Sequence, residues 1–150
     1  MKESPEIQKL EKQLRSTNIS AFGFMGTDSR SLSEIINSDM SDLSELGVSI
    51  TKIVSRMKEI TAKAESSLGN WTQIDDRLQA RVDEAKGHII CPWPHPAGCA
   101  IRITYVRIPE TNQDFQWTDL NIHLIEEHNF FEGKGSPYRI EPKELVKIIF

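Results

Sequence analysis

The sequence predicts an α+β fold in one compact domain, residues 1–150, with a helical subregion over residues 1–69 packed against a second subregion over residues 70–150. Three observations support this prediction. Before Gly69, apolar residues recur at the spacing of amphipathic helices. After Gly69, the run AIRITYVRI alternates apolar and polar side chains, as a half-buried strand does. A chain of 150 residues is also long enough to bury a single core shared by both parts.

The helical subregion carries several helix-start signals. Ser4 precedes a proline at the first helical position and predicts the first helix. Ser31 and Glu34 have the spacing of a capping box and predict the next helix. Asp39 and Asp42 repeat this signal, so we expect a separate short helix there, which ends at the following glycine.

The longest helix is expected from a cap at Ser49 to about Leu68. Its apolar residues recur at i, i+4, i+7 and i+11, which predicts one buried face with charged residues on the opposite side. These apolar residues are Ile53, Met57, Ile60 and Ala64. In the loop before residue 31, Phe22, Phe24 and Met25 are expected to enter the core.

The second subregion is predicted to hold an antiparallel hairpin followed by a helix, a ββα-like unit. Residues 77–92 favour two strands that turn at Lys86, although a polar helix end has a similar composition. The alternating strand is followed by the turn PETNQ and the returning strand DFQW. Thr118 then predicts the cap of a helix that runs to about Phe131. Pro142 opens a last helix.

Composition argues against several classes of protein. The net charge of −4 and the lack of a basic excess disfavour binding through many phosphate contacts. No run approaches the roughly 18 apolar residues of a membrane span, and the N-terminus lacks the apolar core of a secretory signal. We therefore expect a cytoplasmic protein with no membrane partner. In that reducing compartment, two cysteines are expected to be free thiols or metal ligands.

All cysteine and histidine side chains fall between residues 88 and 128, a clustering expected by chance on the order of one time in a thousand. Their order is two thiols around a proline-rich loop, two strands, and two imidazoles on the following helix. Prolines at alternate positions stiffen the loop CPWPHPAGC and could bring its two cysteines together. The clustered residues are His88, Cys91, His95, Cys99, His123 and His128.

This order resembles a two-cysteine two-histidine zinc finger, in which a hairpin supplies sulfur and a helix supplies nitrogen to a tetrahedral ion. Four residues separate His123 from His128, as in fingers, whereas seven separate the cysteines, so the hairpin would be enlarged. The resemblance implies a Zn2+ site formed by Cys91, Cys99, His123 and His128. His95 is the alternative metal ligand, in exchange for one of the helical histidines. Without an ion, both cysteines would be buried as small apolar side chains.

A catalytic zinc is a second interpretation of the same residues. The run HLIEEH resembles the inverted zincin signature HxxEH with one residue inserted, and a zinc-dependent hydrolase would use His123, Glu127 and a thiol. The insertion turns the second histidine by about 100° around the helix. A hydrolase also needs an open coordination position. Because two thiols can complete four ligands, the sequence favours a structural ion.

Two further segments invite functional interpretations. Residues 42–57 resemble a helix-turn-helix and would serve a DNA-binding regulator, but Arg56 stands where an apolar residue is usual. The glycine-rich run GKGSPYR could bind an anion through Lys134, Ser136 and Arg139. A helix C-cap followed by a proline-stiffened connection explains the same run.

The runs WTDLNIHLIEEHNFFEGKGSPYR, CPWPHPAGC and GFMGTDSRSLSEII together resemble a set of small bacterial proteins, taken as cytoplasmic, that carry no assigned activity. The resemblance covers most of the chain. We therefore expect a zinc-binding, non-catalytic interaction or regulatory protein. Its expected partner is a protein, with nucleic acid disfavoured, and its pathway and oligomeric state stay open.

Overall fold

The computed structural model describes residues 4–16, 23–95 and 98–150. Over these residues it contains five helices and one four-stranded antiparallel sheet, which confirms the α+β class. The helices are α1 (Pro5–Leu14), α2 (Leu32–Leu46), α3 (Ile50–Glu65), α4 (Asp119–His128) and α5 (Pro142–Ile149). The strands are β1 (Thr72–Gln73), β2 (Gln79–Ile90), β3 (Gly98–Ile108) and β4 (Gln113–Thr118).

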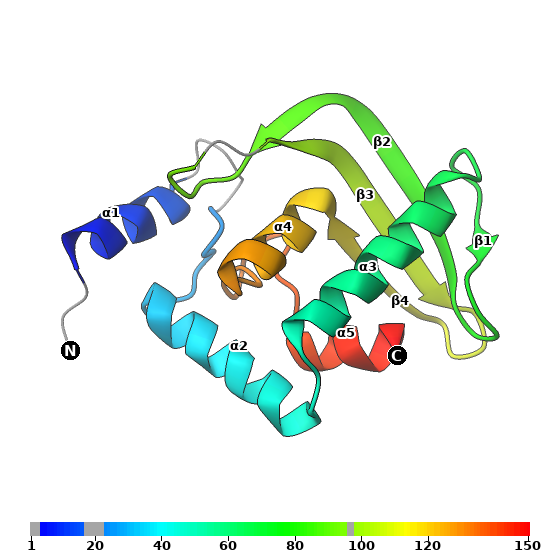
Figure 1. Cartoon of the computed structure of the whole chain (residues 1–150), viewed down its shortest axis with the longest axis horizontal. Helices are drawn as coiled ribbons and strands as arrows, with labels where there is room; N and C mark the ends of the chain where they lie inside the picture. The colour runs from blue at the N-terminus through cyan, green and yellow to red at the C-terminus, as the bar shows by residue number, and fades with distance from the viewer. Residues whose placement is uncertain (1–3, 17–22, 96–97) are drawn as a thin grey trace.

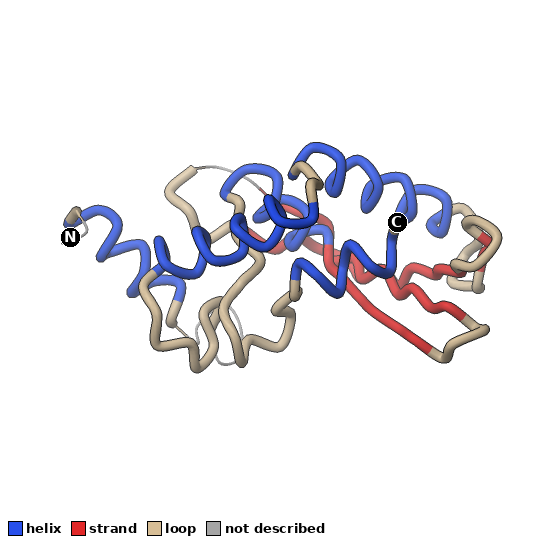
Figure 2. Tube along the Cα trace, turned by 90° about the horizontal axis from the view of Figure 1, so that it is seen from below, coloured by secondary structure: helices blue, strands red, loops and turns tan. Residues whose placement is uncertain are grey.

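The sheet is a meander in which the strands lie in the order β1-β2-β3-β4, each antiparallel to the next. Helix α3 packs on β2 and α4 packs on β3. Figure 1 shows the long β2–β3 hairpin arching over α4, with α1 near the tip of the hairpin. In the perpendicular view of Figure 2, the strands lie below the helices that pack on them. No described helix has the length and apolar character needed to cross a membrane.

Five of the helix starts predicted from the sequence are confirmed. In four of them, the side-chain oxygen of the cap accepts a hydrogen bond from the backbone N–H three residues on. Glu34 and Asn121 return a hydrogen bond to the cap, which completes a capping box at α2 and at α4. The caps are Ser4, Ser31, Ser49 and Thr118, and Pro142 begins α5. The predicted buried face of α3 is fully covered at Ile53, Met57, Ile60 and Ala64.

The separate helix predicted at Asp39 and Asp42 is wrong, because α2 runs through both residues without a break. Asp39 does not cap a helix. Its carboxylate accepts two hydrogen bonds from the guanidinium of Arg139, at 2.5 and 2.8 Å. The two side chains are only 3% and 7% exposed. This buried ion pair ties α2 to the segment that precedes α5.

The prediction of two strands that turn at Lys86 is also wrong, because this region forms the single long strand β2. A β-bulge interrupts its pairing with β3 between Ala85 and His88, and Gly87 has a φ of +103°. The bulge absorbs the residues that resembled a turn. The chain turns further on, in the loop CPWPHPAGC, while the predicted turn PETNQ does join β3 to β4.

Two apolar clusters form the core, and each contains residues from both sides of Gly69. The larger cluster lies between α3, α5 and the sheet, and it includes the buried Trp117. The smaller cluster joins α1 and the start of α2 to α4, and it contains Cys91. Phe24 and Met25 are buried in the smaller cluster, as predicted, and residue 22 lies outside the described residues.

The loop before α2 and the loop after α4 fit against each other backbone to backbone. A Cβ atom added at Gly26, Gly133 or Gly135 would overlap the facing loop. The backbone N–H of Gly133 donates to the carbonyl of Phe24 at 2.8 Å. Early and late segments of the sequence are thus in direct contact, which only glycine permits at these positions.

Replacing Asp39 by alanine should lower the free energy of unfolding by about 3–5 kcal/mol, because the buried guanidinium of Arg139 loses its charged partner. Urea denaturation followed by circular dichroism measures this change. Asp42→Ala on the same helix is the matched control, since Asp42 lies 3.7 Å from Lys143 and the two side chains are 33% and 54% exposed. The control should lose less than about 1 kcal/mol. Equal losses in the two variants would contradict the assignment.

Candidate metal centre

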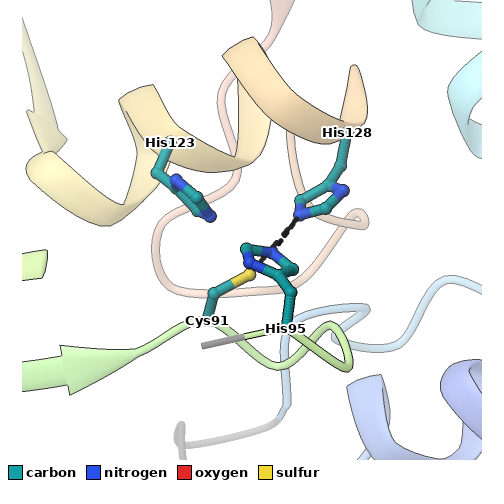
Figure 3. Close-up of side chains that lie close together, drawn as sticks. All are labelled: Cys91, His95, His123 and His128. Carbon is teal, nitrogen blue, oxygen red and sulfur yellow. Dashed lines mark hydrogen bonds between the residues drawn. The ribbon is translucent and has the colours of Figure 1, made fainter. Parts of the chain in front are cut away.

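Cys91 and His95 come from the loop between β2 and β3. Cys91 directly follows β2 and is 2% exposed. The backbone N–H of His95 donates to the carbonyl of Trp93 at 2.8 Å, a tight three-residue turn centred on Pro94. The fixed φ of proline suits this turn. Figure 3 shows the His95 ring directed toward the same point as the sulfur of Cys91.

His123 and His128 come from α4, which begins directly after β4. The predicted extension of this helix to Phe131 is wrong, because Asn129 adopts a left-handed φ of 54° and α4 ends at His128. The two histidines are five positions apart, and their ring centroids are 5.6 Å apart. Both rings face the loop that carries the thiol (Figure 3).

One sulfur and three ring nitrogens lie within 4.8 Å of one another. The Sγ of Cys91 is 3.5 Å from Nε2 of His128, and Nε2 of His95 is 2.9 Å from the same nitrogen. In a tetrahedral zinc site, with bonds of about 2.3 Å to sulfur and about 2.0 Å to nitrogen, ligand atoms lie roughly 3.3–3.6 Å apart. This set could therefore hold a metal ion after small side-chain adjustments. We call it the Cys/His group: Cys91, His95, His123 and His128.

The Cys/His group shares three positions with the ligand set predicted first from the sequence. The shared positions are Cys91, His123 and His128, and the fourth member is His95, the alternative ligand. Cys99 lies outside the group, in β3, where its backbone pairs with Ile89 of β2. It is a free thiol that lines a cleft together with His123. A role for Cys99 as a ligand stays a prediction.

Burial favours the uncharged forms of the donor groups. Together with the nearby rings of His95 and His123, burial lowers the pKa of His128 to about 4. Burial is also the main cause that lowers the pKa of His123, and it raises the pKa of the Cys91 thiol. Neutral imidazoles can bind a metal directly, whereas a thiol must first lose its proton.

Aromatic rings cover one side of the Cys/His group. The indole of Trp93 stacks on the ring of His128, with centroids 4.0 Å apart and planes 6° apart. Phe130 contacts Trp93 edge to face at 5.4 Å. Within the described residues, the buried Nε2 of His123 has no hydrogen-bond partner. A buried nitrogen without a partner is unfavourable, and a bound cation would satisfy it.

The run GKGSPYR is engaged in contacts within the chain. The hydroxyl of Ser136 donates to the carboxylate of Glu132 at 2.5 Å, and Arg139 belongs to the buried ion pair described above. The backbone N–H of Lys134 donates to the carboxylate of Asp28 at 3.1 Å. Carboxylates of the protein thus already occupy these donors, and anion binding here stays a prediction.

The helix-turn-helix-like residues 42–57 cover the end of α2, a turn and the first half of α3. Arg56, on the helix that would read DNA, donates to the backbone carbonyl of Ile149 and to the carboxylate of Asp75, both at 2.8 Å. It also forms an ion pair with Glu59. The guanidinium is therefore bound to three groups of the protein itself.

Sequence reasoning missed the buried acidic residue beside α4, Glu132. Glu132 is 2% exposed, and its carboxylate accepts hydrogen bonds from Asn121 at 2.9 Å and from Ser136. Asn121 belongs to the capping box of α4, so this contact helps to fix the helix that carries His123 and His128. Burial raises the pKa of Glu132 to about 7. No local signal could reveal it, because its partners meet only in the folded chain.

The four donor side chains of the Cys/His group lie close enough together to hold a metal ion. Comparison of the chain with protein family models, curated proteins and solved structures found no match. The fold brings one thiol and three imidazoles together, and these side chains are the candidate functional residues.

Replacing Glu132 by glutamine should reduce the pH dependence of stability. The folded protein keeps a proton on Glu132 up to about pH 7, whereas the unfolded chain releases it near the ordinary value of 4.5. The native state is therefore favoured most below pH 4.5 and loses up to about 3 kcal/mol as the pH rises through 7. Relative to wild type, the free energy of unfolding of Glu132→Gln should rise by about 2–3 kcal/mol between pH 5 and pH 8.

Urea titrations at several pH values measure this difference. Glu144→Gln is the control, because it removes an exposed carboxylate from α5 and should follow the wild-type dependence. A constant difference between Glu132→Gln and wild type over the whole range would show that Glu132 does not titrate differently in the native state.

Proposed function

We propose that the Cys/His group binds one zinc ion as a structural centre, and that the protein is a non-catalytic interaction or regulatory module. The observation that carries the proposal is the convergence of one thiol and three imidazoles, from two separate segments, within 4.8 Å. Thiolate and imidazole ligands together favour zinc, whereas magnesium and calcium prefer oxygen ligands. The site would be zinc-finger-like in its ligand types, with a longer loop and with His95 as the fourth ligand.

A full set of protein ligands supports a structural ion over a catalytic one. Four ligands complete a tetrahedral zinc site, whereas a hydrolase keeps one position for water. In the proposed site, His95 takes the position that a catalytic water would need. Glu127, the base of the hydrolase alternative, is exposed on α4.

The ion would join the loop after β2 to the end of α4. These two segments border the smaller apolar cluster, where α1 and the start of α2 pack. Bound zinc would also satisfy the buried Nε2 of His123. We therefore infer that zinc sets the conformation of the surface that α1, α4 and the loop form together.

A protein is the partner that fits the chain best. The net charge of −4 disfavours nucleic acid, and Arg56 of the helix-turn-helix-like segment is bound within the protein. On the sheet, Arg107 lies 3.9 Å from the ring centroid of Trp71, and Arg81 lies 4.3 Å from that of Tyr105. Tryptophan, tyrosine and arginine are the residue types in which protein interfaces concentrate binding energy.

Protein prepared without a histidine tag should contain about one zinc per chain by elemental analysis. X-ray absorption should show three nitrogen ligands and one sulfur ligand at about 2.0 and 2.3 Å. At free zinc a thousandfold above Kd, the ion should add about 4 kcal/mol of stability. This corresponds to roughly 8–16 °C in Tm for a chain of this length.

Cys91→Ser and His128→Gln should abolish both zinc binding and this shift in Tm. His88→Gln is the matched control, because His88 is exposed on β2 and outside the Cys/His group. A folded wild-type protein whose Tm does not respond to zinc would overturn the proposed centre. An oxygen ligand in place of one nitrogen would favour the hydrolase instead.

Fluorescence anisotropy tests the class of partner. Random duplex DNA and single-stranded RNA, at low salt, should show no binding with a Kd below about 1 μM, since the acidic chain offers few phosphate contacts. Tighter binding that weakens steeply with added salt would refute the assignment of a protein partner and support the DNA-binding alternative.

A further inference from the structure

A cleft of about 490 Å³ lies beside the Cys/His group, between α3, the start of β3 and α4. His123, a member of the group, lines this cleft together with Cys99. Lys58 and Glu126 also line it, are 55% and 41% exposed, and form an ion pair at 3.0 Å. The cleft therefore connects the solvent to one member of the Cys/His group.

Cys99 is the more accessible of the two thiols. It is half-buried, whereas Cys91 is 2% exposed. Both cysteines contact the smaller apolar cluster, and the backbone of Cys99 pairs with Ile89, two residues before Cys91. Cys99 thus lies on the strand next to the segment that carries Cys91, although it is outside the Cys/His group. It is a second thiol, more accessible to solvent than Cys91.

The route through the cleft is the more open path for an ion. Cys91 is buried, and Trp93 with Phe130 covers the side of His128. His123 belongs both to the cleft and to the Cys/His group, and its buried Nε2 has no hydrogen-bond partner in the part of the chain that the structure describes. The charged side chains of the lining are joined in ion pairs, Lys58 with Glu126 and Arg102 with Glu65 and Asp119. With three carboxylates and two cations, the lining keeps one excess negative charge, which does not oppose the entry of a cation.

We propose that Cys99 is the exchange ligand of the zinc centre. An incoming ion binds Cys99 and His123 in the cleft, and it then moves to the remaining members of the Cys/His group. The inference rests on the proposed function, because only a site that holds zinc can exchange it. His123 keeps its bond to the ion throughout, and release follows the same steps in reverse.

The steps balance in protons and involve no oxidation. When Cys99 binds zinc, its thiol proton leaves to the solvent. When the ion moves on, Cys91 binds it and loses its own proton, while Cys99 leaves the ion and takes up a proton. Each zinc bound therefore releases one proton overall, and no second reactant is needed.

A spare thiol changes the rate at which the ion can leave. In a site with four ligands and no replacement, one strong bond must break before a new one forms. A neighbouring thiol that takes over a coordination position lowers this barrier, and each 1.4 kcal/mol of lowering is about a tenfold gain in rate. The zinc content can then follow the supply of free zinc, as a regulatory site requires.

The test measures the rate of zinc transfer from the loaded protein to an excess of a chromophoric chelator. Cys99→Ser should still bind about one zinc per chain but should transfer it about tenfold more slowly than wild type. Uptake of free zinc by the metal-free variant should be slower by a similar factor. Ala100→Ser is the matched control, because it places the same hydroxyl at the next position of the cleft lining and keeps Cys99.

Two results would overturn the exchange role of Cys99 and leave the proposed zinc centre standing. Equal transfer rates in wild type and Cys99→Ser would show that Cys99 takes no part in exchange. Loss of zinc in Cys99→Ser, with zinc retained in His95→Gln, would make Cys99 a resident ligand instead. Wild-type protein that binds no zinc would overturn the proposed function, and this inference with it.

Alkylation provides a second measurement that does not depend on the folding of a variant. In zinc-loaded wild type, iodoacetamide should modify Cys99 and spare Cys91. The modified protein should keep its zinc and transfer it as slowly as Cys99→Ser. Modification of Cys99 without any change in the transfer rate would also overturn the inference.

Discussion

The convergence of four donor side chains on one point is the constraint on which the rest of the structure depends. Cys91 and His95 are fixed to the end of β2, whereas His123 and His128 belong to α4. To bring them together, the β2–β3 hairpin arches over α4, as Figure 1 shows, and the helix ends at its second histidine. Among the described residues, the buried Nε2 of His123 has no hydrogen-bond partner in this arrangement. A bound cation would satisfy this nitrogen and hold the four donor side chains together.

Contacts outside the Cys/His group hold these two segments in place. The register of β3 with β4 pairs Ile103 with Thr118, which places the start of α4 beside the middle of β3. Arg102 then binds Asp119 of the first turn of α4 at 2.7 Å. Asn121 adds a second attachment, to a buried carboxyl whose pKa lies near 7. The positions of His123 and His128 thus depend on the register of β3 with β4 and on the ion pair of Arg102 with Asp119. They also depend on the hydrogen bond that joins Asn121 to Glu132.

Local signals predicted most of the elements, and they failed where a contact between distant residues decides the outcome. The cap at Thr118 depends on a residue three positions away, so spacing alone predicts it. Asp39 carries the same kind of signal, but Arg139, 100 residues later, takes its carboxylate. The clustering of thiols and imidazoles indicated the candidate site. The membership of His95 in place of Cys99 depends on a turn at a proline and on strand register, which no spacing rule contains.

The backbone contact between the loop before α2 and the loop after α4 distinguishes the candidate metal centre from a zinc finger. A zinc finger folds around its own ion, and copies of it can be strung together in one chain. Here Gly26, Gly133 and Gly135 leave no space for a side chain where early and late segments meet, and both apolar clusters span the same halves. The part that carries the Cys/His group therefore does not form a separate unit. Recombination could transplant it only together with the helices that precede it.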